Sequence, residues 1–210
     1  VVNAINSALP RITNDVVVLT EPATLLDANA LRNAVSYLSA DDIGGATGNL
    51  RIGERKGSLG DFRAIIHAVR NKQRQLEADV DSAGFASGEL IAFKRNLVER
   101  LDEGLILEDT QIGYVIRSKG YRIVVAKNAY CHEPAQRSFK GQTKYFARTM
   151  TVGLKNEAVY LKRMLSTRYG LFGLLILPTN FLQQTAAPAL FFALLGLLFL
   201  DVLLHNALLL

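Results

Sequence analysis

Residues 107–125, LEDTQIGYVIRSKGYRIVV, decide the fold. After two adjacent acids, apolar residues recur at helical spacing from 110 to 119, which predicts a helix with one inward face. Gly120 is a residue typical of a helix end. The β-branched run at 121–126 then predicts a strand. A helix leading directly into an apolar strand is one repeating unit of an α/β sheet.

The segments upstream continue this alternation. Residues 15–20, DVVVLT, predict a strand buried on both faces, as in a parallel sheet. Asp27 is placed to cap a following helix over 28–38. A second strand is expected within 43–52. These elements predict an α/β fold with a mostly parallel sheet flanked by helices.

The middle of the chain predicts a long helix, a turn and another strand. Residues 61–80 form the clearest helical pattern, with apolar residues on one face and most of the basic residues on the other. Residues 84–93 read as a turn entering a strand, and 94–100 as a short helix.

The C-terminal residues differ sharply in composition from the rest. No charged residue occurs between 171 and 200. We therefore expect a globular domain over 1–165 and a membrane-associated segment over 166–210. Within that segment, 171–182 predicts an interfacial helix, and about 186–204 is long enough to cross a bilayer. The first residues read as the inside of a helix, so we expect further sequence before Val1.

Basic residues between the domain and the apolar tail outnumber acids. The net charge is +5, and Glu157 is the only acid within this run. Lys and Arg beside a membrane span favour its cytoplasmic side, so we expect a cell-membrane protein with a cytoplasmic domain. One or two of these residues can also hold a phosphate. The basic residues are Arg137, Lys140, Lys144, Arg148, Lys155, Lys162, Arg163 and Arg168.

Two acidic positions are candidates for chemistry. Glu21 lies just beyond the strand at 15–20, and ligands of open α/β sheets bind beyond the carboxyl ends of strands. A carboxylate there can bind a divalent cation or simply face solvent. Asp109, next to Glu108, is either a helix N-cap or a general base that takes a proton from a hydroxyl. A capping residue is rigidly placed, so both roles are compatible.

The remaining polar candidates favour structural roles. His132 and Glu133 follow Cys131, but their spacing matches no zinc pattern. His67 lies between apolar neighbours in the long helix. With Cys131 as the one cysteine, no internal disulfide is possible.

Several segments together resemble the membrane-bound family 2 glycosyltransferases, a group that includes hyaluronan, cellulose and poly-N-acetylglucosamine synthases. They are DVVVLTEPATLLDANAL (15–31), GGATGNL (44–50), ASGELIAFKRNLV (86–98) and residues 107–125. The resemblance covers about residues 1–170. It implies a GT-A fold and inverting transfer of a hexosyl or N-acetylhexosaminyl group from a nucleotide-diphosphate sugar to a polysaccharide or lipid.

The resemblance also assigns roles to residues. Asp109 matches the catalytic base and Glu108 the acid before it. Glu21 matches the first acid of the metal motif, which implies Mg²⁺ or Mn²⁺. The acceptor-lining turn corresponds to Ser87, Gly88 and Glu89.

Three departures from the family pattern bear on donor binding. Ala23 replaces the second acid of the metal motif, so metal binding is weaker, shared with the diphosphate and water, or lost. The Gln-x-x-Arg-Trp motif is replaced by Gln142 and Arg148, which we assign to the diphosphate. The strand that opens the family's fold is missing, and Asn6 falls where the family has an asparagine near the donor.

Two other classes of function compete with the enzyme. The first is a degenerate, membrane-bound binding or scaffold subunit, which Ala23 favours and the acid pair opposes. The second is a nucleic-acid-binding protein. That class needs a basic stripe interleaved with aromatic residues, whereas the basic residues here gather beside the apolar tail.

Overall fold

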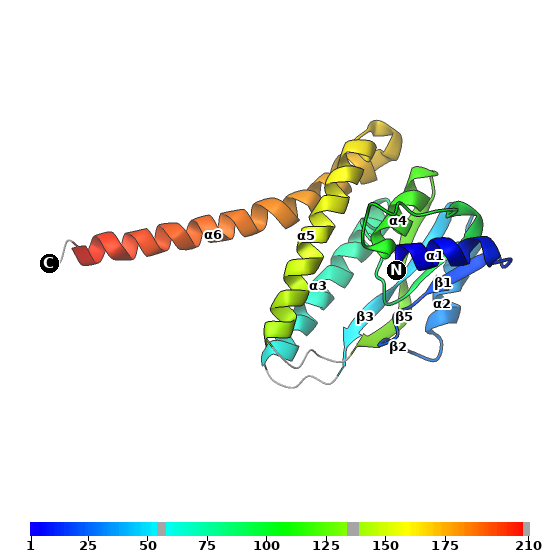
Figure 1. Ribbon diagram of the computed structural model, residues 1–210, viewed down its shortest axis with the longest axis horizontal. Helices are drawn as coiled ribbons and strands as arrows, with labels where there is room; N and C mark the ends of the chain where they lie inside the picture. Colours follow the sequence, from blue (N-terminus) through cyan, green and yellow to red (C-terminus); the bar gives the residue numbers. More distant parts are fainter. Residues whose placement is uncertain (54–57, 134–138, 208–210) are drawn as a thin grey trace.

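A computed structural model describes residues 1–53, 58–133 and 139–207 of the chain (Figure 1). Its centre is a five-stranded sheet in the order β1-β4-β3-β5-β2. The strands are β1 (Val16–Leu19), β2 (Leu25–Leu26), β3 (Ile43–Ile52), β4 (Ile91–Lys94) and β5 (Arg122–Glu133).

The sheet is mixed. Strand β4 runs antiparallel to both neighbours, β1 and β3, and β2 runs antiparallel to β5. Only β3 and β5 pair in parallel among the described strands. Strands β1, β3 and β5 therefore share one direction, which confirms the predicted α/β fold. The strand predicted at 15–20 is β1. Among the described strands it pairs with β4 alone, so it is less enclosed by the sheet than expected.

Helices flank this sheet. They are α1 (Val2–Ala8), α2 (Ala30–Ser36), α3 (Ser58–Val80), α4 (Glu108–Ser118), α5 (Phe139–Met164) and α6 (Leu177–Ala207). Single 3₁₀ turns span Leu9–Arg11, Tyr37–Ser39, Arg95–Leu97 and Thr167–Tyr169. The helix expected at 94–100 is thus only the turn Arg95–Leu97.

Each face of the sheet carries its own core. On one face, α1 and α4 pack Ile5 and Ile112 into a cluster with Phe93. On the other, α2 packs Ala30 and Ala34 against small residues of β3 and β5. Asp27 does not cap α2, whose N-cap is Asn29. Instead the Asp27 carboxylate lies 2.9 Å from His132 Nε2.

Helix α3 confirms the helix predicted at 61–80, and the structure shows which of its two faces meets the sheet. Its apolar residues point outward, with Ile65 63% and Val69 61% exposed. Arg63 and Arg74 are buried against the sheet, where Arg63 pairs with Glu133 at 2.9 Å. The basic face turns inward because these arginines find acceptors on the sheet.

The chain leaves the domain through α6, a long apolar helix. Residues Phe172–Val202 have a mean hydropathy of 2.0 and are long and apolar enough to cross a membrane. A π-helical turn, Phe172–Ile176, leads into α6, which continues without a break through Pro188. In Figure 1, α6 projects from the side of the molecule that carries α3 and α5.

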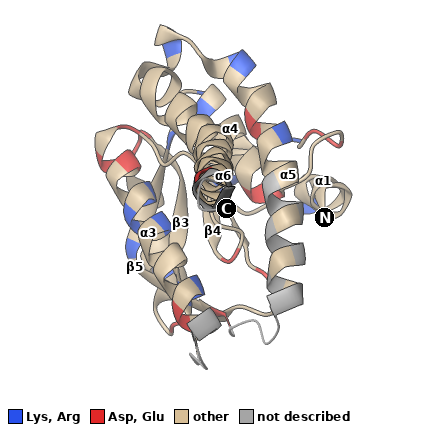
Figure 2. Ribbon diagram, turned by 90° about the vertical axis from the view of Figure 1, so that its left-hand side faces the viewer, with Lys and Arg blue, Asp and Glu red and all other residues tan. Residues whose placement is uncertain are grey.

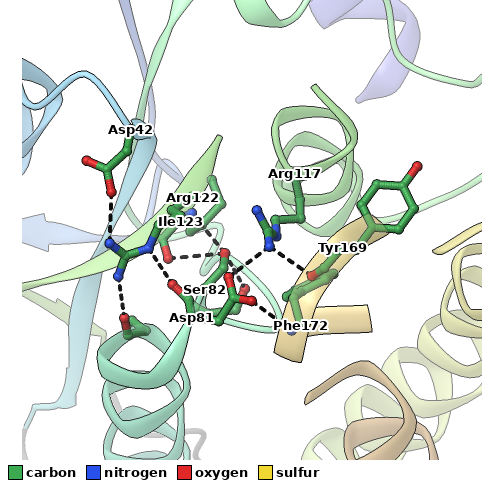
Figure 3. Close-up of polar contacts among 10 residues, drawn as sticks. Asp42, Asp81, Ser82, Arg117, Arg122, Ile123, Tyr169 and Phe172 are labelled. Atoms are coloured by element: carbon green, nitrogen blue, oxygen red, sulfur yellow. Dashed lines mark hydrogen bonds and ion pairs between the residues drawn. The ribbon is translucent and has the colours of Figure 1, made fainter. Parts of the chain in front are cut away.

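A buried ion pair fastens this exit segment to the domain (Figure 3). Arg117, near the end of α4, donates to Asp81 Oδ1 at 2.8 Å and to the carbonyl of Tyr169 at 2.9 Å. The other Asp81 oxygen accepts from the Phe172 backbone N–H at 2.9 Å. One carboxylate therefore joins α4 to the start of the apolar segment.

Candidate active site

Three loops meet at one glycine. They are the loop after β1, the turn before β4 and the start of α4. A Cβ placed on Gly88 would lie 3.2 Å from Glu21 Oε1 and 3.4 Å from Asp109 Oδ2. The carboxylates of Glu21 and Asp109 thus both lie close to the backbone of Gly88. Because Gly88 has no side chain, there is room between them.

Asp109 owes its position to an unusual residue before it. Leu107 adopts φ 70, the left-handed region that a bulky residue rarely occupies. This turn starts α4 at Glu108, with Leu107 as the N-cap residue. Asp109 is therefore not the N-cap. Its Oδ1 accepts from the Thr110 backbone N–H at 2.7 Å, and its other oxygen faces Gly88.

The environment of Asp109 favours its protonated form. Burial is the main cause, and the neighbouring charges of Glu108, Glu89 and Glu21 add to it. Together they raise the pKa of Asp109 to about 7, against the partly offsetting hydrogen bond from Thr110. A carboxyl group with a pKa near neutrality is suited to accept and release protons.

The turn Ser87-Gly88-Glu89 is held by hydrogen bonds from two strands. The Ser87 backbone N–H donates to Thr47 Oγ1 of β3 at 2.8 Å. Thr20, at the end of β1, donates to the Glu89 carbonyl at 2.8 Å, and Ser87 Oγ donates to the Glu89 carboxylate. The segment is thus fixed at the edge of the site before any ligand binds.

Behind this turn lies a buried arginine. Arg74, 2% exposed, donates to Thr47 Oγ1 at 3.4 Å and to the Gly48 carbonyl at 3.3 Å. Two turns earlier on α3, burial and nearby arginines lower the pKa of His67 to about 4. His67 is therefore neutral at physiological pH, which agrees with a structural role.

Glu21 and its surroundings partly fit a divalent cation. Acids gather around Asp109 closely enough to raise its pKa, and a cation would relieve that repulsion. Ala23, however, supplies no ligand. Among residues 1–53, 58–133 and 139–207, no group of three or more His, Cys, Asp or Glu side chains forms a metal cage. A cation here needs the oxygens of a diphosphate or water to complete its shell.

The structure says less about the other residues predicted to bind the sugar donor, which are Asn6, Gln142 and Arg148. Asn6 binds the loop after β4, since its amide donates to the Leu101 carbonyl at 3.0 Å and accepts from the Leu101 N–H at 2.8 Å. Its place in donor binding stays a prediction. Gln142 and Arg148 belong to α5, but their side chains lie outside the described part of the structure.

The cluster at the end of β5 is structural. Cys131 is fully buried, and burial raises the pKa of its thiol to about 12. Its neighbours are engaged, His132 with Asp27 and Glu133 with Arg63.

Sequence reasoning missed the residues that position the site. Asn156 of α5 donates to the Ile106 carbonyl and so holds the loop that leads into Leu107. Gln111, fully buried, donates to the Leu105 carbonyl at 2.9 Å. No local motif marks such contacts.

Comparisons with known proteins agree with this geometry. The model of a family described as "Glycosyltransferase like family 2" matches residues 1–151. Among solved structures, the chain is similar to the mannosyltransferase PcManGT from Pyrobaculum calidifontis, determined in complex with GDP-Man and Mn²⁺. The TM-score is 0.62 at 23% sequence identity. The match covers 97% of this chain and 59% of that one. A comparison with curated proteins finds no match.

The mixed sheet and the acidic site at its edge define an α/β protein of the GT-A-like type. The family match covers well over half of the sequence. The chain therefore belongs to the glycosyltransferase-like family 2.

Proposed function

We propose that this chain transfers a sugar, with inversion, from a nucleotide-diphosphate sugar to a hydroxyl of a polysaccharide or lipid at the membrane, with Asp109 as general base. The transferred group is a hexosyl or N-acetylhexosaminyl unit. The observation that carries this proposal is the juxtaposition of Asp109 and Glu21 against Gly88. It supports the pairing of a base with the loop that the resemblance matches to the donor.

The chemistry follows from a single displacement. Asp109 takes the proton of the acceptor hydroxyl, whose oxygen attacks the anomeric carbon from the face opposite the nucleotide. The bond between that carbon and the diphosphate oxygen breaks, and the nucleoside diphosphate leaves. No enzyme nucleophile is needed. Ser87, Gly88 and Glu89 line the acceptor side, and Glu108 supports the negative field around the base.

The donor side uses Glu21, Asn6, Gln142 and Arg148. A divalent cation, Mg²⁺ or Mn²⁺, held by Glu21 with diphosphate oxygens would stabilise the charge of the leaving group. Arg148 would add a second positive charge at the diphosphate. The Mn²⁺ and GDP-Man bound to the Pyrobaculum calidifontis enzyme support this assignment by analogy of fold.

We also propose that α6 anchors the chain in the cell membrane, with the domain on the cytoplasmic side. We assign residues 1–165 to the catalytic domain and 166–210 to the membrane segment. Support comes from the apolar stretch Phe172–Val202 and from the basic residues that precede it. Nothing in the site favours nucleic acid as a partner.

The central test replaces Asp109 with Asn in the full chain. Removing a general base lowers the transfer rate by about 10³-fold, measured as sugar transfer in membranes or detergent. In the unsubstituted enzyme, kcat/KM should rise with pH through an inflection near 7, because only the deprotonated carboxylate accepts a proton. The matched variant Glu108→Gln should retain more activity. Undiminished transfer by Asp109→Asn would remove the assignment.

A second candidate function is a catalytically degenerate binding or scaffold subunit. Ala23 favours it, because one carboxylate of the family's metal motif is absent. A donor-hydrolysis assay with and without manganese separates the two. The enzyme should release nucleoside diphosphate with a manganese-dependent rate, whereas the scaffold should release none under either condition.

A further inference from the structure

Helix α3 presents an apolar stripe that no described part of the chain covers. The stripe consists of Phe62, Ile65, Val69, Leu76 and Val80, each more than half exposed. These residues recur at three- and four-residue steps or their multiples, so they lie along one side of the helix. Five large apolar side chains in a row on a water-exposed face are uncommon in soluble proteins and mark an interaction surface.

The orientation of α3 is firmly set by its opposite side. Asn71 donates to the Leu50 carbonyl at 2.8 Å, and Arg74 donates to the Gly48 carbonyl. Arg63 is bound to Glu133 by a buried ion pair. Polar groups that are paired with the sheet cannot turn outward without losing these partners. The apolar stripe is therefore a fixed feature of the fold.

The base of α6 lies directly beside this stripe. Gln73 of α3 donates to Asn180 Oδ1 at 2.6 Å and to Gln183 Oε1 at 2.9 Å, both in the first turns of α6. Figure 2, in which α6 points toward the viewer, shows α3 on that same side of the molecule. In Figure 1, α3 runs across the direction of α6. A helix that crosses a spanning helix at its base lies along the membrane surface.

Charged side chains flank the stripe on both sides. Arg70 is exposed on one side, and Lys72 is exposed on the other together with Asp61 and Asp79. Beyond Lys72, a groove of about 500 Å³ opens toward Arg51, Lys127 and Tyr130. Lys127 is within 3.9 Å of Asp79. An apolar stripe between charged edges is the pattern of a helix that lies in a bilayer interface.

We propose that α3 docks on the surface of a lipid bilayer, with its apolar stripe at the headgroup–acyl boundary and its charged edges at the headgroups. This proposal rests on the membrane placement given under the proposed function. The surface would hold the domain by two elements, α3 along the bilayer and α6 across it. The acidic site would then be kept at a fixed orientation to the membrane.

The test uses nitroxide spin labels on single cysteines in the full chain, with buried Cys131 replaced by Ser. Labels are placed by Ile65→Cys, Val69→Cys and Leu76→Cys, and the protein is reconstituted into vesicles of phosphatidylcholine and phosphatidylglycerol. We expect collisions with oxygen, which dissolves in lipid, to exceed those with a water-soluble nickel complex several-fold. The matched control Leu31→Cys, exposed on α2, should show the reverse ratio.

Each outcome bears on the proposal. Labels on α3 that are as water-accessible as Leu31→Cys would overturn it. Labels that are shielded from both reagents would also overturn it, because a second copy or another protein segment then covers the stripe. A label at Leu195→Cys reports on α6 separately. If the label at position 195 is also accessible to the water-soluble reagent, α6 does not cross the bilayer and the membrane placement is wrong. Sugar transfer is measured in a separate assay, so its outcome is independent of the results for α3 and α6.

Discussion

Gly88 is the residue on which the arrangement of the site depends most closely. Its missing side chain lets two carboxylates approach one backbone position. In the proposed transfer, the acceptor hydroxyl and the anomeric carbon both lie near Asp109 for in-line attack. A small change at this glycine therefore acts on the chemistry while leaving the core untouched.

Gly88→Ala should lower kcat by about 10²-fold, because its methyl group would press on Glu21 Oε1 and fill the space between the two carboxylates, where the reacting groups are proposed to lie. The matched control is Gly113→Ala within α4, where the nearest atom to a new Cβ is 3.8 Å away. That variant should keep its activity. Kinetics and thermal unfolding of both variants in detergent provide the comparison. Equal activity of the two would contradict the close approach at Gly88.

The raised pKa of Asp109 also predicts that the ionised carboxylate, the form that would act as a base, lowers the stability of the fold. Burial raises that pKa from 3.8 to about 7. Between these values the folded chain keeps a proton that the unfolded chain has lost, so stability falls as pH rises through this window. Asp109→Asn removes the buried charge and should raise the free energy of unfolding by roughly 1–3 kcal/mol above about pH 8. Near pH 4 the gain should vanish, as measured by denaturant unfolding; a pH-independent difference would contradict it.

Among the elements, the loop before α4 explains how the base is placed. Leu107 in the left-handed region costs on the order of 1–3 kcal/mol and persists only because its surroundings impose it. Asn156 of α5 supplies one of those constraints, since it binds the Ile106 carbonyl. A helix on the route to the membrane thus helps to shape the active-site loop.

Asn156→Ala should therefore reduce both stability and turnover. The substitution removes a partly buried hydrogen bond to the Ile106 carbonyl, at a cost of about 1 kcal/mol, and it frees Leu107 to relax. We expect kcat to fall more than donor KM rises, measured by steady-state transfer. The control is Asn33→Ala, which removes a comparable bond to the Asn128 carbonyl at the surface of α2. Unchanged turnover in Asn156→Ala would show that the loop holds its shape alone.

Elements also show what the sequence could and could not predict. Strands at 15–20 and 121–126 and helices at 61–80 and 110–119 have local signals, and all four are present. Periodicity reveals that α3 has two faces, but it does not say which one meets water. The inward arginines of α3 depend on acceptors in β3 and β5, far away in the sequence.

The candidate site was predictable only in part, for the same reason. The family resemblance selected Glu21, the Ser87–Glu89 turn and Asp109, and the structure brings these three segments together. Their catalytic roles stay predictions. The N-cap assignment for Asp109 was wrong because spacing does not reveal the backbone turn at Leu107. Thr47 and Asn156 position the site from other elements, and no motif announces them.

At the scale of the whole molecule, α4 links the candidate site to the membrane segment. Asp109 lies in its first turn and Arg117 in its last, about 12 Å apart along the axis of this helix. Arg117 and Asp81 hold Tyr169 and Phe172 beneath that end. The Phe172 ring packs on Tyr114 of the same helix, with ring centroids 6.2 Å apart. The distance from base to membrane exit is therefore fixed by one rigid element.

Breaking the Arg117–Asp81 ion pair should loosen the segment around Tyr169 and Phe172 from the domain. Arg117→Met leaves Asp81 buried without its cation, and loss of one partner of a buried pair costs about 3–5 kcal/mol. We expect faster proteolysis near residues 165–171 and a lower midpoint of unfolding in detergent. The control Arg100→Met breaks the exposed Arg100–Glu103 pair and should change stability by less than about 1 kcal/mol. If the two variants resist protease equally, α6 must be held mainly by the amide contacts of Gln73 with Asn180 and Gln183.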